Sequence, residues 1–238
     1  MNPNNNSGLP WPALTKGVLV RRYKRFMADV LLDGGELVTT HCPNSGSMKS
    51  CCEPGRPVYL SRSSNPKRRL AYTWELIEMP SSLVGVNTGV PNKLVRQSVI
   101  DEVIPELLGY ESVRAEVRYG LNSRLDLLLE SPGKSCFVEI KNCTLIDGNV
   151  AYFPDAVTTR GLKHLVDLQE IAKSSNRAVI FFLVQRMDAS IFRPADHIDP
   201  AYGLELRRAM RNGVEILCYD VSISLENIAL NKPLACQL

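Results

Sequence analysis

The sequence predicts a two-part chain, with an all-β module over residues 12–86 followed by an α/β domain over residues 87–238. Three observations lead to this prediction. Short β-branched and aromatic runs separated by turn residues fill the first part. In the second part, strand-like segments mix with helix-like ones in the order strand, strand, strand, helix, strand. Between the two parts, residues 87–91 contain the Gly and Pro typical of a linker. Residues 1–11 are expected to form a disordered tail.

The all-β module is expected to contain roughly five short strands. An Asp33-Gly34 pair predicts a tight turn, and a longer loop is expected over residues 42–55. This number of strands in so short a segment is typical of a small closed barrel, and an SH3-like barrel fits the pattern almost as well. The predicted strands cover residues 17–25, 28–32, 36–41, 57–61 and 70–78.

The second part is expected to begin with a helix over residues 92–101, where apolar residues recur at helical spacing after a possible Asn92 cap. Pro200 and Gly213 stand where a helix commonly starts and stops. The predicted strands cover residues 113–119, 123–130, 136–141, 178–184 and 214–219, and the later helices cover residues 158–174 and 200–211.

Composition excludes several classes of protein. The 238 residues are 45% hydrophobic and 22% charged, which is ordinary for a globular chain. No apolar run is long enough to cross a membrane, and the N-terminus lacks the pattern of a signal peptide, so a cytoplasmic location is expected. The seven cysteines include no Cys-x-x-Cys pair, which predicts free thiols and no zinc site.

The most informative residues are Asp126, Glu139 and Lys141. Alternation along a strand places Glu139 and Lys141 on the same face, and a hairpin turn over residues 131–134 would bring Asp126 beside them. Two carboxylates are the oxygen ligands that Mg²⁺ or Mn²⁺ requires, and Lys141 could share the charge of a phosphate under attack. Glu116, on the preceding strand, is a candidate third acid. The alternative is a solvated hairpin face that happens to carry these charges.

This arrangement resembles the PD-(D/E)xK nuclease domain, with Asp126 and the Glu139-Ile140-Lys141 triplet at the motif positions. The sequence departs from the motif at Leu125, where its name has proline. The resemblance implies a metal-dependent phosphodiesterase site with Asp126 and Glu139 as metal ligands, Glu116 assisting and Lys141 catalytic. It also implies polar groups from the following helix, which offers Thr158, Arg160, Lys163 and His164.

Nearly the whole chain also resembles the sugar fermentation stimulation protein A family. The resemblance lies in ordered strings at residues 19–26, 41–46, 72–75, 152–158 and 177–182. It implies an N-terminal OB-type barrel, a C-terminal nuclease-like domain and DNA as the partner. It therefore favours the OB-type barrel over the SH3-like alternative.

Positive charge is concentrated in the first module. Residues 12–86 contain 11 Lys and Arg against 6 Asp and Glu, whereas residues 87–238 contain 17 against 19. Clustered cations bind phosphates, and aromatic rings among them stack on bases. The alternative for these side chains is ordinary solvation or barrel packing. The candidate nucleic-acid-binding residues are Arg21, Arg22, Tyr23, Lys24, Arg25, Arg62, Lys67, Arg68 and Arg69, joined by Arg160 and Lys163 in the second part.

The sequence is therefore compatible with two functions. In one, the chain is a largely sequence-independent DNA-binding protein with a Mg²⁺- or Mn²⁺-dependent nuclease site. In the other, it is a non-catalytic DNA-binding regulator of sugar (maltose) metabolism built on a nuclease scaffold. No convincing helix-turn-helix is present, which argues against specific base recognition. RNA remains an alternative to DNA, since basic loops and aromatic faces serve both polymers.

Overall fold

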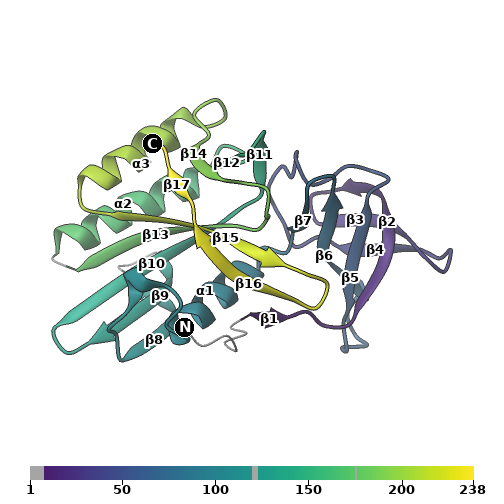
Figure 1. Cartoon of the computed structure of the whole chain (residues 1–238), viewed down its shortest axis with the longest axis horizontal. Coiled ribbons are helices and arrows are strands. Elements are labelled where there is room, and N and C mark those ends of the chain that lie inside the picture. The colour runs from purple at the N-terminus through teal and green to yellow at the C-terminus, as the bar shows by residue number, and fades with distance from the viewer. Residues whose placement is uncertain (1–7, 120–122, 175) are drawn as a thin grey trace.

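A computed structural model of the chain describes residues 8–119, 123–174 and 176–238, and it consists of a β-barrel module beside an α/β domain (Figure 1). In Figure 1 the barrel lies on the right, and the α/β domain, with its helices above and below a central sheet, lies on the left. The two-part organisation predicted from the sequence is confirmed.

The barrel is one antiparallel sheet that closes on itself. Its strands follow the order β4-β3-β2-β5-β6-β7, and a parallel pairing of His41 in β4 with Thr73 in β6 closes five of them. Alternate residues point inward around Trp74, Leu60 and Val30, which are fully buried. The strands are β2 (Leu14–Tyr23), β3 (Met27–Leu32), β4 (Leu37–His41), β5 (Pro57–Arg62), β6 (Tyr72–Met79) and β7 (Ser82–Gly85).

Two details of this barrel differ from the sequence prediction. Strand β2 ends at Tyr23, so Lys24 and Arg25 do not continue it but form the turn into β3, both with positive φ (48° and 61°). Arg25 therefore does not share a strand face with Arg21 and Tyr23. The extra strand β7 is too short to give a periodic signal of its own, and it forms because it pairs with β6.

The α/β domain is built on a seven-stranded sheet in the order β1-β16-β15-β13-β10-β9-β8, in which β1 is the short N-terminal strand Leu9–Pro10. Its middle strands, β10, β13 and β15, are parallel, and helices α2 and α3 make the crossovers between them. The elements are α1 (Val90–Ile100), η1 (Pro105–Leu107), β8 (Ser112–Tyr119), β9 (Ser123–Ser131), β10 (Lys134–Cys143), α2 (Thr159–Lys173), β13 (Arg177–Val184), α3 (Pro200–Arg211), β15 (Glu215–Ile223) and β16 (Asn227–Pro233).

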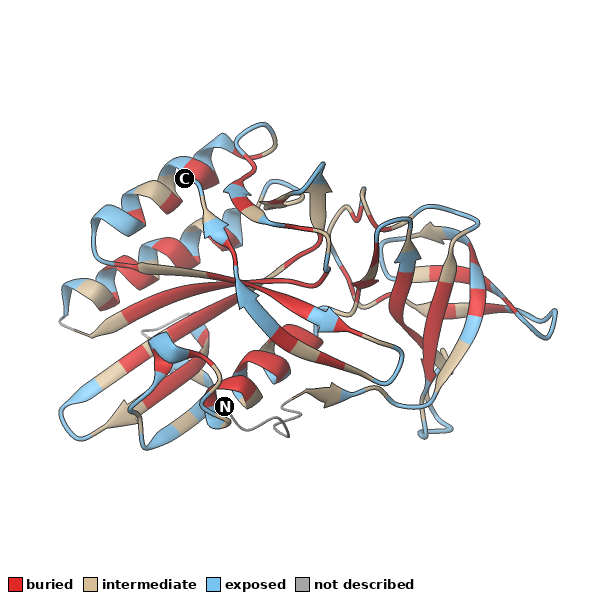
Figure 2. Ribbon diagram, viewed as in Figure 1, coloured by how far each residue is buried: buried red, intermediate tan, exposed pale blue. Residues whose placement is uncertain are grey.

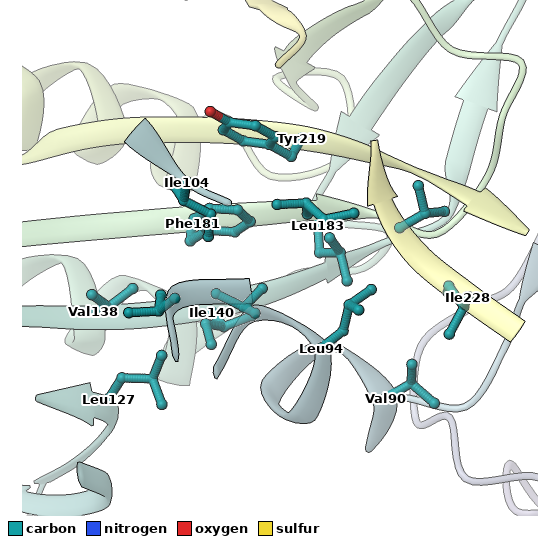
Figure 3. Close-up of a cluster of buried hydrophobic side chains, with 14 of the residues drawn as sticks. Val90, Leu94, Ile104, Leu127, Val138, Ile140, Phe181, Leu183, Tyr219 and Ile228 are labelled. Atoms are coloured by element: carbon teal, nitrogen blue, oxygen red, sulfur yellow. The ribbon is translucent and has the colours of Figure 1, made fainter. Parts of the chain in front are cut away.

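Both faces of the sheet are covered, which explains the continuous apolar run in β13. Residues 178–184 are all buried, because a central parallel strand has no solvent face. Phe181 and Leu183 pack toward α1, as Figure 3 shows with Leu94. Phe182 lies on the other side, in the cluster shared with α2 and α3. Figure 2 shows the same pattern, with the buried stretches concentrated in the central strands.

A second, small sheet lies where the α/β domain approaches the barrel (Figure 1). It has the order β11-β12-β14-β17, and no strand in it exceeds four residues. Such short strands carry little periodicity, and sequence analysis did not predict them. They are β11 (Leu145–Asp147), β12 (Val150–Phe153), β14 (Ile191–Pro194) and β17 (Ala235–Cys236).

The expected N-terminal tail is wrong for residues 8–11. Strand β1 (Leu9–Pro10) pairs with β16, and the Trp11 indole N–H donates to the Ser224 carbonyl at 3.1 Å. Trp11 also packs against the core on the α1 side of the sheet. Partial burial of this large ring explains the order, and the prediction failed because the polar residues before it dominated the composition. Residues 1–7 lie outside the described part.

The two modules are joined by a buried charged residue, Arg186. Arg186 is 2% exposed, and its guanidinium donates to the Thr144 carbonyl at 2.9 Å and forms an ion pair with Asp188 at 2.6 Å. Asp188 also accepts a hydrogen bond from Ser81 of the barrel at 2.5 Å. The charged groups of Arg186 and Asp188 are therefore paired where the two modules meet.

All seven cysteines are free thiols, as predicted, and most are buried. Burial raises the pKa of the Cys51 thiol to about 12, which keeps it protonated and unreactive at neutral pH. Among the described residues, no helix is both long enough and apolar enough to span a membrane.

We predict that Asp188→Asn lowers the free energy of unfolding by about 3 kcal/mol at neutral pH, because it leaves Arg186 buried without a charged partner. Burial tends to raise the pKa of Asp188, but hydrogen bonds from Arg186 and Ser81 outweigh it and hold this pKa below its ordinary 3.8. The stabilisation is therefore present above pH 3.8 and is lost as the pH falls through the lowered pKa.

Urea unfolding at pH 7 and in acid measures both effects. The matched control is Glu53→Gln, which breaks the exposed pair of Glu53 with Arg56 and should change stability by less than about 0.5 kcal/mol. Equal losses in the two variants would contradict this account of the junction.

Candidate active site

The hairpin of β9 and β10 brings Asp126 to Glu139, as predicted. The turn between the strands is completed by Gly133 at φ 76°, a conformation that glycine adopts without strain. The ladder between the strands runs from the Lys134–Ser131 pair to the Val138–Leu127 pair. At the next position a side chain replaces the strand partner, because the Ile140 N–H donates to Asp126 Oδ2 at 2.7 Å. The Asp126 carboxylate is thereby fixed against the backbone of β10.

Asp126 accepts a second hydrogen bond, from Asn92, which the sequence analysis had expected to cap α1. The Asn92 side chain donates to Asp126 Oδ1 at 2.7 Å, whereas the N-cap of α1 is Gly89. Helix α1 therefore reaches across to hold the site carboxylate. An Asn near a helix start is indistinguishable from a cap in the sequence, and only the packing of α1 on the sheet reveals its partner.

Glu139 is 2% exposed, and its two carboxylate oxygens have different environments. Oε1 accepts from Lys141 Nζ at 2.7 Å and from His164 Nδ1. Oε2 is buried and has no hydrogen-bond partner. Buried carboxylate oxygens are normally satisfied, so an orphaned oxygen at this position marks a place for a ligand.

His164 is positioned by helix α2. The helix begins where the Thr158 hydroxyl accepts from the Gly161 N–H at 3.0 Å, and the Thr158 N–H is taken by Asp199 at 2.9 Å. Arg160 is the second residue of α2, and its Nε lies 3.4 Å from His164 Nε2. His164 Nδ1 lies against Glu139 Oε1 and also 3.1 Å from Lys141 Nζ, so the three side chains form one cluster. Arg160 thus lies at the edge of the cluster, as expected.

The two carboxylates have opposite pKa shifts. Burial, reinforced by the negative charge of Glu139, raises the pKa of Asp126. Burial acts on Glu139 in the same direction, but the hydrogen bonds and positive charge from His164 and Lys141 outweigh it, so the pKa of Glu139 is lowered. Neighbouring acids with pKa values pushed apart are typical of functional sites.

Glu116 does not join this cluster, which corrects the expectation of a third acid. Its backbone has a positive φ of 54°, and its exposed side chain pairs with Arg124 at 2.8 Å. Across residues 8–119, 123–174 and 176–238, no three His, Cys, Asp or Glu side chains are grouped so that they could hold a metal ion. Any metal here would have two carboxylate ligands, Asp126 and Glu139.

In the barrel, several predicted nucleic-acid-binding residues are occupied by internal contacts. The Arg22 guanidinium donates to the carbonyls of Asn44 (2.7 Å), Gly46 (3.0 Å) and Arg25 (3.0 Å). It therefore holds the loop after β4 in place. Loop-holding arginines and phosphate-binding arginines have the same sequence signature, so the sequence alone could not separate them.

The Arg21 and Tyr23 pair is also partly committed. Both side chains donate to Asp29, at 2.8 and 3.0 Å, and the Arg21 guanidinium lies 5.0 Å from the centre of the Tyr23 ring. Arg21 nevertheless keeps 68% of its side chain exposed. The pair offers one cation to solvent, and its ring is covered on one side.

Four further predicted cations lie over residues 62–69, at the end of β5 and in the loop that follows. Arg62, Lys67 and Arg69 are exposed, and Arg68 lies 3.2 Å from His41. Lys24 and Arg25 are exposed at the β2–β3 turn. Lys163, on α2, forms an ion pair with Asp167 at 3.0 Å and points away from Glu139, toward which its neighbour His164 is directed.

Comparison with known proteins identifies the family. The SfsA N-terminal OB domain matches residues 20–86, and the sugar fermentation stimulation protein RE domain matches residues 89–227. A sugar fermentation stimulation protein homolog from Geobacter sulfurreducens is 58% identical, covering 95% of this chain and 97% of its own. The chain belongs to the sugar fermentation stimulation protein family. A homolog from Nitrosococcus oceani is 52% identical, over 94% of this chain and 97% of that protein.

A solved structure in this family has the same fold. Pyrococcus furiosus SfsA, in complex with Ca²⁺, superimposes with a TM-score of 0.89 over 97% of this chain and 98% of that one, at 27% identity. The predicted fold class, an OB-type barrel followed by an α/β domain, is therefore confirmed, and the SH3-like alternative is excluded.

We predict that Arg22→Ala lowers the free energy of unfolding by about 1–3 kcal/mol, because several carbonyls lose a charged donor. Arg69→Ala, which removes an exposed cation from the loop, should leave stability within about 0.5 kcal/mol of the original. Urea unfolding of the two variants makes the comparison. An Arg22→Ala protein as stable as Arg69→Ala would show that the contacts of Arg22 contribute nothing to the fold.

Proposed function

We propose that the chain binds DNA through its barrel and hydrolyses phosphodiester bonds at Asp126, Glu139 and Lys141 with the help of Mg²⁺ or Mn²⁺. One observation carries the proposal: Glu139 is buried beside Asp126, and its Oε2 has no partner. A protein rarely buries a polar atom that nothing satisfies, and a divalent cation would satisfy it.

The residues at the site fit such an ion. Mg²⁺ commonly binds through one or two carboxylates and keeps several waters, so Asp126 and Glu139 suffice without Glu116. Each Asp126 oxygen accepts one hydrogen bond and retains a further lone pair. When bound, the ion would lower the pKa of a coordinated water and offset charge on the phosphate.

The protein's own side chains have distinct tasks in this proposal. Asn92 and the Ile140 N–H orient Asp126, and His164 orients Glu139. Lys141 supplies a fixed ammonium group, which stabilises negative charge as it develops on the phosphate oxygens. Arg160, at the start of α2, adds a second positive charge on the same side of the site.

The barrel is the proposed source of DNA affinity. Its exposed cations at the β2–β3 turn and in the 62–69 loop would contact phosphates without regard to sequence. OB-type barrels in general bind nucleic acid through such surfaces. The Ca²⁺ complex of the Pyrococcus furiosus relative also supports a divalent-ion site in the family.

We predict that wild-type protein cleaves labelled DNA with Mg²⁺ or Mn²⁺ and not with chelator, and that Asp126→Asn or Lys141→Ala reduces the rate at least about 100-fold. Both variants should bind DNA within a few-fold of the original, since the barrel is untouched. The assay measures cleavage and affinity on single- and double-stranded DNA and on matched RNA.

The control is Lys163→Ala, which removes the exposed α2 cation that pairs with Asp167 and should keep full activity. Metal-stimulated cleavage that persists in both Asp126→Asn and Lys141→Ala would contradict the site. Salt-sensitive binding with no cleavage of any substrate would instead support the non-catalytic, DNA-binding alternative.

A separate prediction concerns the barrel. The double change Lys67→Ala with Arg69→Ala should weaken DNA binding and flatten the plot of log affinity against log salt by about 1–2 units, with cleavage at saturating DNA unchanged. Fluorescence anisotropy at several salt concentrations measures the slope. An unchanged slope would remove the 62–69 loop from the proposed interface.

A further inference from the structure

A cavity of about 390 Å³ lies between the barrel and the α/β domain. Both modules form its wall, and it lies beside Asp126, Glu139 and Lys141 without including them. From the barrel side come the β2–β3 turn, the loop after β4 and the linker, and from the other side come the end of β10, β12 and the segment before α2. The lining includes Arg25, Gly46, Asn142, Asp155, Val157 and Thr158.

The cavity adjoins the candidate active site along two elements. Asn142 directly follows Lys141, at the carboxyl end of β10. Thr158 is the N-cap of α2, the helix that carries Arg160 and His164 to Glu139. In α/β sheets, ligands bind outside the carboxyl ends of the parallel strands, and this cavity occupies that place.

Asn142 presents a hydrogen-bond donor at the cavity. Its Oδ1 accepts from Gln185 Nε2 at 2.7 Å, and Gln185 also donates to the Asn87 carbonyl at 3.2 Å, which uses both of its amide protons. The Asn142 amide is therefore held with its oxygen toward Gln185, and its NH₂ group is left to donate to a ligand.

Asp155, in the segment before α2, presents an acceptor at the same cavity. Its Oδ2 accepts from the Met48 N–H at 3.1 Å and the Ser47 hydroxyl at 3.3 Å, which fixes the carboxylate and leaves Oδ1 for a further donor. Gly46 allows this close approach, because a side chain there would collide with both carboxylate oxygens. The cavity wall thus combines a rigid donor with a rigid acceptor.

The wall also has an apolar part, formed by Tyr152, Phe153, Pro154 and Val157, of which Val157 is 72% exposed. An exposed apolar side chain beside polar groups suits contact with the face of a planar ring. The cavity's charges are one exposed arginine, Arg25, and the Asp155 carboxylate, so it is unsuited to hold a phosphate. Paired donors and acceptors with an apolar surface are instead what the edge and face of a nucleobase require.

We propose that this cavity binds a single unstacked nucleobase of the strand whose phosphodiester lies at Asp126, Glu139 and Lys141. The inference rests on the proposed function, since the base arrives as part of a bound strand. The volume lies at the small end of the range for ligand pockets, about 300–1,000 Å³, and admits one nucleotide unit rather than a duplex. Arg25, at the rim, would contact the adjoining phosphate. Cleavage would accordingly favour single strands or sites at which a base is easily unpaired.

The test uses single-stranded oligonucleotides of about 15 nucleotides, close to the span of an OB-type barrel, each with one abasic position moved along the strand. Affinity is measured by fluorescence anisotropy with Asp126→Asn protein, which keeps the strand intact. We expect one position, next to the bond that wild-type protein cuts, at which base removal weakens binding about fivefold or more. All other positions should show little change.

The variants Asn142→Ala and Val157→Ser, each added to Asp126→Asn, should remove that position dependence. The matched control is Val166→Ser, an exposed valine on α2 away from the cavity, which should retain it. Val157→Ser keeps the test valid if Asn142→Ala disturbs Gln185 and folds poorly.

The outcomes separate the two proposals. Equal effects at every abasic position, or a position effect that survives both variants, would overturn the base-binding cavity while leaving DNA binding and cleavage intact. Failure of every oligonucleotide to bind would overturn the proposed function, and the cavity's role with it.

Discussion

The structure around the candidate site depends on one constraint, the burial of the Glu139 carboxylate in the central sheet. A buried charge must be paired, because its transfer from water costs several kcal/mol. Lys141 supplies a charge from the same strand, and His164 supplies a hydrogen bond from α2. The second partner fixes the position of α2, whose start is held in turn by Asp199 at the head of α3. Partners from β10 and α2 thus converge on one side chain, of which Oε1 is satisfied and Oε2 has no hydrogen-bond partner.

A small number of hydrogen bonds also joins the two modules. The loop held by Arg22 in the barrel is the loop whose Ser47 and Met48 bind Asp155, and Asp155 precedes α2 by only a few residues. Arg186 ties the other side of the junction. In the proposed function, a strand held by the exposed cations of the barrel would pass the interdomain cavity before reaching Lys141. Such a path would connect DNA binding by the barrel to hydrolysis at the candidate site.

Sequence analysis predicted the parts of this structure that local pattern controls. The strands of the hairpin and the helix at residues 200–211 carry clear periodicity, the strand after α2 is a continuous apolar run, and the pairing of Asp126 with Glu139 follows from hairpin geometry. Residues with two possible partners were less predictable. Asn92 has the signature of a cap but holds Asp126, and Arg22 has that of a phosphate ligand but holds a loop. Glu116 has the right spacing, yet its positive φ and its partner Arg124 keep it at the surface. The partner of such a residue depends on tertiary contacts, which the spacing of residues in the sequence does not reveal.

The central claim is that Asp126 and Glu139 together form a divalent-ion site without a third acid. Anomalous diffraction from crystals of the protein soaked in Mn²⁺ tests it most directly, because it locates the ion independently of any activity. The account predicts one strong peak within coordination distance of Glu139 Oε2 and an Asp126 oxygen, about 2.0–2.3 Å from each. Absence of a peak there at saturating Mn²⁺, or a peak at Glu116 instead, would contradict it.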